Sequence, residues 1–300
     1  MAGVPGPCDM PDLATAALAS ARTLARSLGL PADDPVVLAD GANVVVHLAP
    51  APVVAKAAAS SRTIRDAGAF LARELAVAAA VRAAGLPAVA PSDAVPARVH
   101  EHDGVAVTFW ERVPLAEGAL PGPDRLGAML AELHAALRAS GLALPRLAPL
   151  DDIPRFAARA GATGAEDRKR IAAAYERLAA QLAPAAEQPL HGDAHPGNLL
   201  PAAHGGWLWC DFEDTCAGPL HWDLATLRRS PRLDGAAALR AYARAAGRDE
   251  LDDAALAPWI ALRELHLTVW YCLYAERQPA LRPRAEELLA RWRAAQPPFD

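Results

Sequence analysis

Polar side chains of several chemical types are concentrated in residues 190–198, which read L-H-G-D-A-H-P-G-N. Asp193 and Asn198 lie five positions apart, and the Pro-Gly pair between them forces a turn that can direct both side chains into one small volume. A second carboxylate follows in W-C-D-F-E-D, where Asp211 ends an apolar run. Carboxylate and amide oxygens are hard ligands of the type that Mg²⁺ uses together with phosphate oxygens. The two segments therefore favour phosphoryl transfer at a magnesium site.

The spacing H-x-D-x-x-x-x-N, followed by D-F, matches the phosphoryl-transfer pattern of kinases. With H-G-D in place of H-R-D, the sequence resembles the aminoglycoside phosphotransferase and choline kinase family of small-molecule kinases. The run D-F-E-D-T-C-A-G-P-L-H-W-D, from Asp211 to Asp223, resembles the second signature of that family. The resemblance implies ATP or GTP as phosphoryl donor, Mg²⁺ as cofactor and a hydroxyl group of a small molecule as acceptor. It also implies that Asp193 is catalytic and that Asn198 and Asp211 bind the metal.

A lysine and a glutamate are the candidates for the phosphate-binding ion pair of a kinase. Lys56 closes the apolar run V-V-A-K-A, and Glu74 shares one helix face with Phe70, Val77 and Val81. A carboxylate within an apolar stripe needs a partner, because an unpaired buried charge is costly. The resemblance implies that Glu74 orients Lys56 toward the nucleotide. A pair between Glu74 and an arginine at the helix edge is the alternative.

Two further segments resemble parts of the family's nucleotide site. The segment 108–113, T-F-W-E-R-V, resembles the hinge that reads adenine through backbone groups, which implies nucleotide contacts at Trp110 and Arg112. The turn 40–43, D-G-A-N, would cover the nucleotide, although it departs from the G-x-G-x-x-G of protein kinases. This departure leaves the contacts to the phosphates unassigned.

Residues around the two signatures have supporting roles in this interpretation. In the family, the Asp that matches Asp223 ties down the catalytic loop, and we expect a structural role for it. We expect His191 to brace the loop through its ring. No role follows for His195, and Asp214 is either a supporting group beside the metal or an acid in a turn.

Length and composition restrict the class of protein. Three hundred residues with 53% hydrophobic content suit a globular protein with a substantial core. The net charge of −5 does not favour a nucleic-acid partner, and no apolar run is long enough for a membrane span. The four cysteines show no C-x-x-C spacing, and the N-terminus does not read as a signal peptide, so we expect a cytoplasmic protein without disulfides. Lysine and arginine total 30, and only Lys56 and Lys169 are lysines.

The order of expected elements changes near residues 110–114. Before that point the pattern predicts a leading helix, three short β-branched strands, one main helix and two further strands, over residues 11–29, 36–39, 44–48, 53–57, 66–84, 95–100 and 105–110. After it, helix follows helix, interrupted by a loop and a hairpin at 190–212. We therefore expect an α+β, two-lobed, protein-kinase-like fold. A nucleotide-binding lobe with an antiparallel sheet would comprise residues 1–113, and a helical lobe with the catalytic loop and the acceptor site would comprise 114–300.

A helix expected over residues 255–275 carries a candidate acceptor surface. Four of its residues share one face at i, i+4, i+7 and i+11: Trp259, Arg263, His266 and Trp270. Aromatic rings with an Arg and a His suit a partly wet cleft wall, while Ile260, Leu267 and Tyr271 on the neighbouring face suit the core. The alternative is that the tryptophans belong to the core and that Arg263 is a surface or ion-pair residue.

Two other classes of function are open. A zinc metallohydrolase could use His and Cys ligands near the loop, but no third spaced histidine follows: the candidates are His191, Asp193, His195, Cys210 and Asp211. A nucleotide-binding pseudokinase would be expected to lack at least one of the five residues that the kinase pattern requires, and all five are present. No feature of the sequence indicates the oligomeric state, the preference for ATP or GTP, or which acceptor is used, among aminoglycosides, macrolides, amino alcohols and sugars.

Overall fold

The computed structural model describes residues 13–117, 120–182, 184–249 and 252–294, which form two compact units. The first unit contains the described residues up to Gly68 and the segment Ser92–Arg112. The second contains Ala69–Pro91 and the described residues from Val113 onward. The assignment of residues 1–113 to a nucleotide-binding lobe and of 114–300 to a lobe with the acceptor site stays a prediction.

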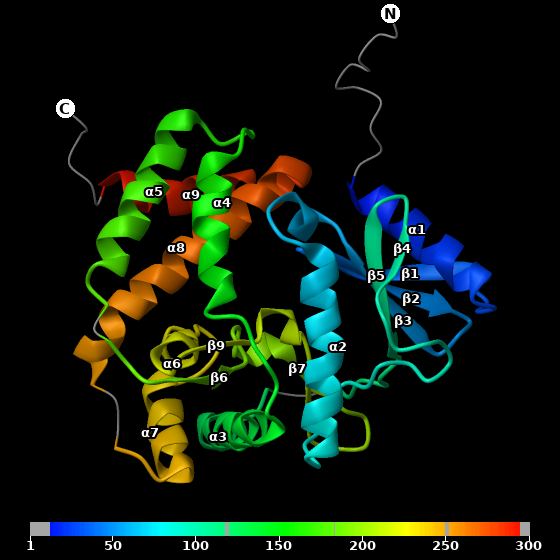
Figure 1. Cartoon of the computed structure of the whole chain (residues 1–300), viewed down its shortest axis with the longest axis horizontal. Coiled ribbons are helices and arrows are strands. Elements are labelled where there is room, and N and C mark those ends of the chain that lie inside the picture. Colours follow the sequence, from blue (N-terminus) through cyan, green and yellow to red (C-terminus); the bar gives the residue numbers. More distant parts are fainter. Residues whose placement is uncertain (1–12, 118–119, 183, 250–251, 295–300) are drawn as a thin grey trace, which may run out of the picture. The chain divides into compact units, whose positions relative to one another are not determined.

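The first unit is built on a five-stranded antiparallel sheet in the order β1-β2-β3-β5-β4 (Figure 1). Its strands are β1 (Asp34–Asp40), β2 (Asn43–Ala49), β3 (Val53–Ala58), β4 (His100–His102) and β5 (Val105–Glu111). The expected sheet of about five strands with one inserted helix is confirmed. The strand expected over 95–100 is wrong, because Pro96 cannot donate a ladder hydrogen bond and its carbonyl instead accepts the N–H of Arg98 at 2.8 Å.

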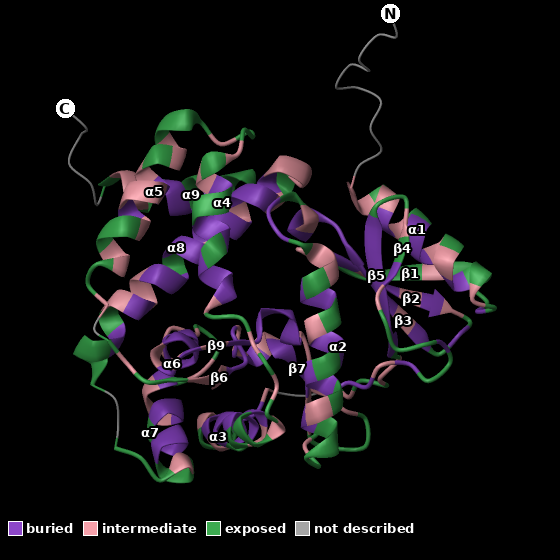
Figure 2. Ribbon diagram, viewed as in Figure 1, coloured by how far each residue is buried: buried purple, intermediate pink, exposed green. Residues whose placement is uncertain are grey.

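Helix α1 (Leu13–Ser27) packs against this sheet through a face of small residues. Ala17, Ala21 and Ala25 are fully buried, and the absence of longer side chains lets the helix approach β2 and β3 closely. In Figure 2 the strands of the sheet centre are largely buried, whereas the outer face of α1 is exposed. Lys56 lies in the central strand β3, between Val45 of β2 and Thr108 of β5, and is buried.

The second unit is mainly helical. Its helices are α2 (Ala67–Ala83), α3 (Pro123–Ser140), α4 (Asp152–Ala158), α5 (Ala165–Ala179), α6 (His221–Arg228), α7 (Gly235–Ala246), α8 (Asp253–Arg277) and α9 (Arg282–Ala294). Helices α3 and α7 lie side by side (Figure 1). They meet at Gly127, where a Cβ would overlap the carbonyl oxygen of Ala238 and lie 2.7 Å from the amide nitrogen of Tyr242. Lys169 lies on α5 and is exposed.

Two pairs of short strands interrupt the helices. The hairpin expected before Asp211 is confirmed as β7 (Leu199–Pro201) paired with β8 (Trp207–Trp209). A second antiparallel pair, β6 (Glu187–Leu190) with β9 (Cys216–Pro219), was not expected from the sequence. Both of its strands are four residues long and contain a proline, so they carry neither alternation nor a β-branched run.

Two further predictions from the sequence concern membrane spans and disulfide bonds. None of the helices in the described ranges is long and apolar enough to cross a membrane. Within the described part of the chain, Cys210, Cys216 and Cys272 form no disulfide, while Cys8 lies outside it.

The close approach of α3 and α7 gives a test of the packing. Gly127→Ala should destabilise the protein by about 1–3 kcal/mol, because overpacking against the α7 backbone outweighs the gain in helix propensity. Thermal unfolding measures the effect. Gly68→Ala in the first turn of α2 is the control, since its Cβ would meet only Asp66 at an ordinary 3.5 Å. Equal melting temperatures for the two variants would contradict the tight α3–α7 contact.

Candidate active site

Two antiparallel strand pairs bring the chemical residues of the second unit together. Strand β6 ends at Leu190 and β7 begins at Leu199, so residues 191–198 form a loop between them, which we call the catalytic loop. Pairing of β7 with β8 places the end of this loop beside the segment that follows β8. The N–H of Cys210 donates to the carbonyl oxygen of Asn198 at 3.0 Å, and Asp211 is the next residue.

Asn198 folds back onto Asp193 through the turn that Pro196 and Gly197 produce. Its Nδ2 donates to the carbonyl oxygen of Asp193 at 2.9 Å and lies 3.4 Å from Oδ2 of the same residue. Since the NH₂ group is used in these contacts, Oδ1 is the atom of Asn198 left to bind a cation. The expectation that Asp193 and Asn198 share one small volume is confirmed.

The carboxylate of Asp193 lies between two basic side chains. Arg263 of α8 contacts Oδ1 through Nη2, and Nε2 of His195 lies 3.3 Å from Oδ2. Burial opposes ionisation of this carboxyl, but the charge of Arg263 and the hydrogen bond from His195 outweigh it and hold the pKa of Asp193 well below its usual range. Asp193 is therefore an ionised hydrogen-bond acceptor at neutral pH.

His195 has a defined place even though the sequence analysis assigned it no role. Its Nδ1 accepts the N–H of Gly197 at 2.9 Å, which caps the short 3-10 turn Pro196–Asn198. Burial would lower the pKa of His195, but the charge of Asp193 and the hydrogen bond to it prevail and raise that pKa above its usual value. The side chain thus joins the turn of the loop to the carboxylate of Asp193.

His191 is fully buried and both of its ring nitrogens are engaged, as expected of a residue that braces the loop. Nε2 donates to the carbonyl oxygen of Cys210 at 3.2 Å, and Nδ1 accepts the N–H of Asp193 at 3.3 Å. The ring packs against Trp209 and Phe212. Burial lowers the pKa of His191, so the imidazole is neutral, and because both ring nitrogens are engaged with the backbone neither is left to act as a base.

Asp223 of α6 is fully buried and holds the start of the catalytic loop through backbone groups. Oδ2 accepts the N–H of His191 at 2.8 Å, and Oδ1 accepts the N–H of Gly192 at 2.9 Å. Nε2 of His134 on α3 also donates to Oδ2 at 2.8 Å, and Nδ1 of His134 accepts the Tyr242 hydroxyl of α7 at 2.9 Å. Burial opposes ionisation, but the hydrogen bond from His134 prevails and lowers the pKa of Asp223. The sequence carried no signal for His134, which reads as an ordinary helix residue.

Gly192 is a position where only glycine fits. Its φ of +89° is left-handed, and a Cβ there would overlap the carbonyl oxygen of Asp214. Its own carbonyl accepts the indole N–H of Trp222 at 2.7 Å. Asp214 is buried in the turn that crosses the loop.

Carboxylates gather where the kinase pattern predicts the metal. Side-chain oxygens of Glu74, Asp211 and Glu213 lie within 4.8 Å of one another. Arg73 of α2 donates to the carbonyl oxygen of Glu213 at 3.0 Å, so the helix that carries Glu74 is tied to this turn. Oxygen donors alone make up the group, and this donor set fits Mg²⁺. Glu74 had been expected to pair with Lys56, and its approach to Asp211 was not foreseen.

Three expected nucleotide-binding residues lie in the first unit. Lys56 is on β3, while Trp110 and Arg112 lie at the end of β5. The indole N–H of Trp110 donates to the Thr108 hydroxyl at 2.9 Å, and the N–H of Arg112 donates to the carbonyl oxygen of Pro52 at 3.0 Å. Their roles toward a nucleotide, and the pairing of Lys56 with Glu74, stay predictions.

Of the two interpretations of the α8 stripe, burial agrees with the alternative that places the tryptophans in the core. The four residues of the stripe are at most 7% exposed, because this face of α8 packs toward the protein interior: Trp259, Arg263, His266 and Trp270. Nε2 of His266 lies 2.9 Å from Oδ2 of the buried Asp152. The face that had been assigned to the core is the partly exposed one: Ile260, Leu267 and Tyr271.

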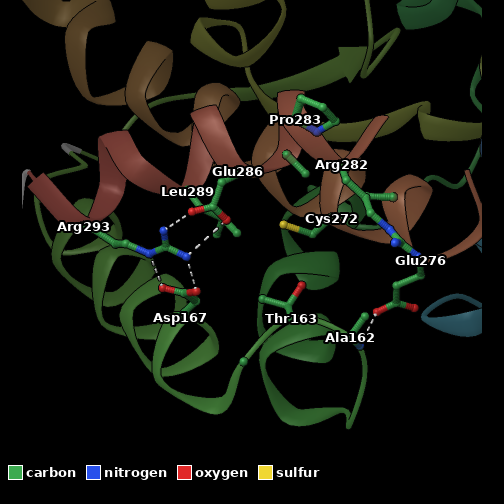
Figure 3. Close-up of a pocket in the computed structure, with 13 residues that line it drawn as sticks. Ala162, Thr163, Asp167, Cys272, Glu276, Arg282, Pro283, Glu286, Leu289 and Arg293 are labelled. Atoms are coloured by element: carbon green, nitrogen blue, oxygen red, sulfur yellow. Dashed lines mark hydrogen bonds and ion pairs between the residues drawn. The ribbon is translucent and has the colours of Figure 1, made fainter. Parts of the chain in front are cut away.

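A cavity of about 690 Å³ lies among α5, α8 and α9 (Figure 3). Arg293 in its wall is paired with Asp167 at 2.8 Å and with Glu286, and Glu276 is paired with Arg159 at 2.9 Å. Burial raises the pKa of the Cys272 thiol to about 11, so this sulfur is not a nucleophile at neutral pH. Its lining contains no residue of the catalytic loop and none of the carboxylates near Asp211, so the cavity is not the candidate active site.

Comparison with known proteins agrees with this arrangement. The model of the phosphotransferase enzyme family matches residues 38–259, more than half of the chain. Similar solved structures include an amicoumacin kinase (14% identity, TM-score 0.68, covering 93% of this chain and 95% of that chain). A microcompartment-associated aminopropanol kinase is also similar, with 20% identity and a TM-score of 0.62, covering 90% of this chain and 95% of that chain. So is a choline/ethanolamine kinase family protein from Mesorhizobium loti, with 22% identity and a TM-score of 0.53, covering 94% of each chain. No curated protein matches the chain. The similarities confirm the protein-kinase-like fold.

The crowding at Gly192 provides a test of the loop geometry. Gly192→Ala should lower the melting temperature more than Gly206→Ala, although both positions have a positive φ. Each variant carries the left-handed strain of about 1–2 kcal/mol, but only the methyl group added at position 192 would also press on the Asp214 carbonyl. Differential scanning fluorimetry measures the difference. If Gly192→Ala were as stable as Gly206→Ala, the packing of the loop against Asp214 would be wrong.

Proposed function

The chain belongs to the phosphotransferase enzyme family, and on this premise we propose that it transfers the γ-phosphoryl group of ATP or GTP to a hydroxyl group of a small molecule. The observation that carries the proposal is the arrangement of the catalytic loop. Asp193 and Asn198 are in hydrogen-bond contact, and the backbone of Asn198 pairs with the residue that precedes Asp211. This order is that of the phosphoryl-transfer pattern, and the contacts hold its residues close together.

In the proposed reaction, Asp193 orients the acceptor hydroxyl and takes its proton. The acceptor oxygen forms a bond to the γ-phosphorus, the bond from that phosphorus to the bridging oxygen breaks, and the nucleoside diphosphate leaves. The lowered pKa of Asp193 supports the orienting part of this role, since an ionised carboxylate accepts a hydrogen bond from the hydroxyl at neutral pH.

The remaining residues have supporting roles in the proposal. Asn198 and Asp211 would hold Mg²⁺, which neutralises charge on the phosphate oxygens when bound. Lys56 would bind the nucleotide phosphates, and Trp110 and Arg112 would lie at the adenine. Glu74 would either orient Lys56 or, beside Asp211, support the metal.

The class of acceptor follows from the similar proteins only in outline. The solved structures are named as kinases of amicoumacin, of aminopropanol and of choline or ethanolamine. These names support a small-molecule acceptor for this chain, with an antibiotic and a metabolite as the two candidates. A screen of ATP consumption across aminoglycosides, macrolides, amino alcohols and sugars distinguishes them.

Two alternatives are less well supported. His191 is one of the candidate ligands of a zinc hydrolase, yet both of its ring nitrogens are engaged by backbone groups. Among the described residues, the one group of acidic, His and Cys side chains close enough to share an ion contains carboxylates alone. A pseudokinase sensor would bind nucleotide without turnover, which the same screen reveals.

The catalytic assignment predicts a specific loss. Asp193→Asn should retain nucleotide binding and lower the phosphoryl-transfer rate by about 10²- to 10⁴-fold, because acceptor positioning is lost while the phosphate site remains. Steady-state turnover and nucleotide titration measure the two properties. Asp234→Asn, which alters an exposed helix cap, is the matched control. A rate near that of the parent would falsify the assignment of Asp193.

The metal assignment predicts a separate loss. Asp211→Asn should weaken nucleotide binding in the presence of Mg²⁺ by at least about tenfold and leave metal-free binding little changed, since even supporting groups at metal sites are worth about 10–100-fold. Isothermal titration with and without Mg²⁺ measures both. Asp253→Asn, at an exposed ion pair with Arg228, is the control. Stoichiometric zinc in the purified protein, lost in His195→Ala or Cys210→Ala, would instead favour the hydrolase.

A further inference from the structure

One arginine from a distant part of the chain is buried against the catalytic loop. Nη1 of Arg263, on α8, donates to the carbonyl oxygen of Gly192 at 3.1 Å, and Nη2 contacts Oδ1 of Asp193. The side chain is only 6% exposed. Arg263 also lies beyond residue 259, where the match to the family model ends. The contact is therefore not part of the matched family pattern.

The orientation of this guanidinium is fixed from a third direction. Its central carbon lies 4.6 Å from the ring centroid of Trp222, and the indole N–H of Trp222 donates to the same Gly192 carbonyl at 2.7 Å. A guanidinium that is stacked on a ring and engaged by two different acceptors has few rotamers left. Arg263 thus differs from a surface arginine that reaches an acid by chance.

The two oxygens of Asp193 are held unequally. Oδ1 has the direct contact with Arg263. Oδ2 has only the longer contacts to His195 Nε2 at 3.3 Å and to Asn198 Nδ2 at 3.4 Å, beyond the usual range of about 2.7–2.9 Å for charge-assisted bonds. The carboxylate is fixed at one oxygen, and the other keeps most of its capacity to accept a hydrogen bond.

From this geometry we infer that Arg263 is a positioning residue for phosphoryl transfer, which fixes Asp193 through Oδ1 so that Oδ2 meets the acceptor hydroxyl. The inference rests on the proposed function. A carboxylate on a short side chain can rotate about two bonds, and misplacement by about 1 Å can cost about 10²-fold in rate. Arg263 removes this freedom through Oδ1, and its bond to Gly192 fixes the backbone from which the side chain starts.

A purely structural ion pair is the competing explanation. It would stabilise the contact between α8 and the loop without acting on the reaction. The two explanations differ in whether the effect of Arg263 passes through Asp193, and a double-mutant cycle measures this coupling.

The test uses hydrolysis of ATP with Mg²⁺, in which water takes the place of the acceptor hydroxyl, and repeats it with any acceptor that the screen identifies. Arg263→Gln should lower kcat by about 10²-fold with little change in the KM for ATP. In the Asp193→Asn background, the same substitution should change kcat by less than about threefold, because the group that it positions is already lost. Arg263→Lys, which keeps the charge but not the fork, should recover part of the rate.

Arg159→Gln is the matched control. Arg159 forms a two-point ion pair with Glu276, which lies on α8 as Arg263 does, but Arg159 does not contact the catalytic loop. This variant should leave kcat unchanged. Thermal unfolding and ADP titration show whether each variant is folded, and Arg263→Lys carries the test if Arg263→Gln does not fold.

Three results would overturn the inference: an unchanged kcat in the folded Arg263 variants, an equal loss of kcat in both backgrounds, or an effect on the KM for ATP alone. A parent chain without any ATP turnover, or an Asp193→Asn variant with full activity, would instead contradict the proposed function and the inference with it. Loss of activity in Asp193→Asn with full activity in the folded Arg263 variants would contradict this inference and leave the proposed function intact.

Discussion

The arrangement of the catalytic loop depends on one buried carboxylate, that of Asp223. It accepts two consecutive backbone N–H groups, from His191 and Gly192, and a third hydrogen bond from His134. A fully buried charge is tolerated only when it is paired and hydrogen-bonded, and these donors meet that condition. Without this carboxylate, two amide groups and an imidazole would lose their acceptor inside the protein. The conformation of the loop is therefore set from within the helical unit and does not require a bound substrate.

The same network joins several helices to the site. From Tyr242 on α7, hydrogen bonds run through His134 on α3 to Asp223 on α6 and on to the loop. Helix α8 adds the contact of Arg263 with Gly192 and Asp193. Because the loop is held largely through its backbone, its side chains are left for chemistry.

The sequence predicted the parts of the site that depend on local chain geometry. Asp193 and Asn198 meet because a Pro-Gly turn separates them, and Asp211 follows because a hairpin returns the chain. The antiparallel meander of β1, β2 and β3 followed from β-branched runs with turn residues between them. Family membership and the class of enzyme were also evident from these motifs.

The features that the sequence did not predict, or predicted wrongly, all depend on tertiary packing. Helical periodicity correctly grouped Trp259 with Arg263, but it cannot tell which side of a helix other helices will cover. The four-residue strands β6 and β9 are stabilised by pairing with each other, so neither is visible alone. His134 acquires its role from Asp223, 89 residues away, and nothing local to His134 indicates it.

Because the sequence contains only two lysines, Lys56 and Lys169, amine-reactive labelling can report on single positions. Lys169 on α5 is exposed, whereas Lys56 in the central strand of the sheet is buried. Among side chains, amine-reactive reagents can modify only these two, and the exposed one reacts first. Once Lys169 is replaced by arginine, slow acylation of the remaining lysine becomes a single-residue reporter. The rate of acylation of Lys56 then measures how often β3 becomes exposed to solvent, and a molecule that binds over this strand would lower that rate.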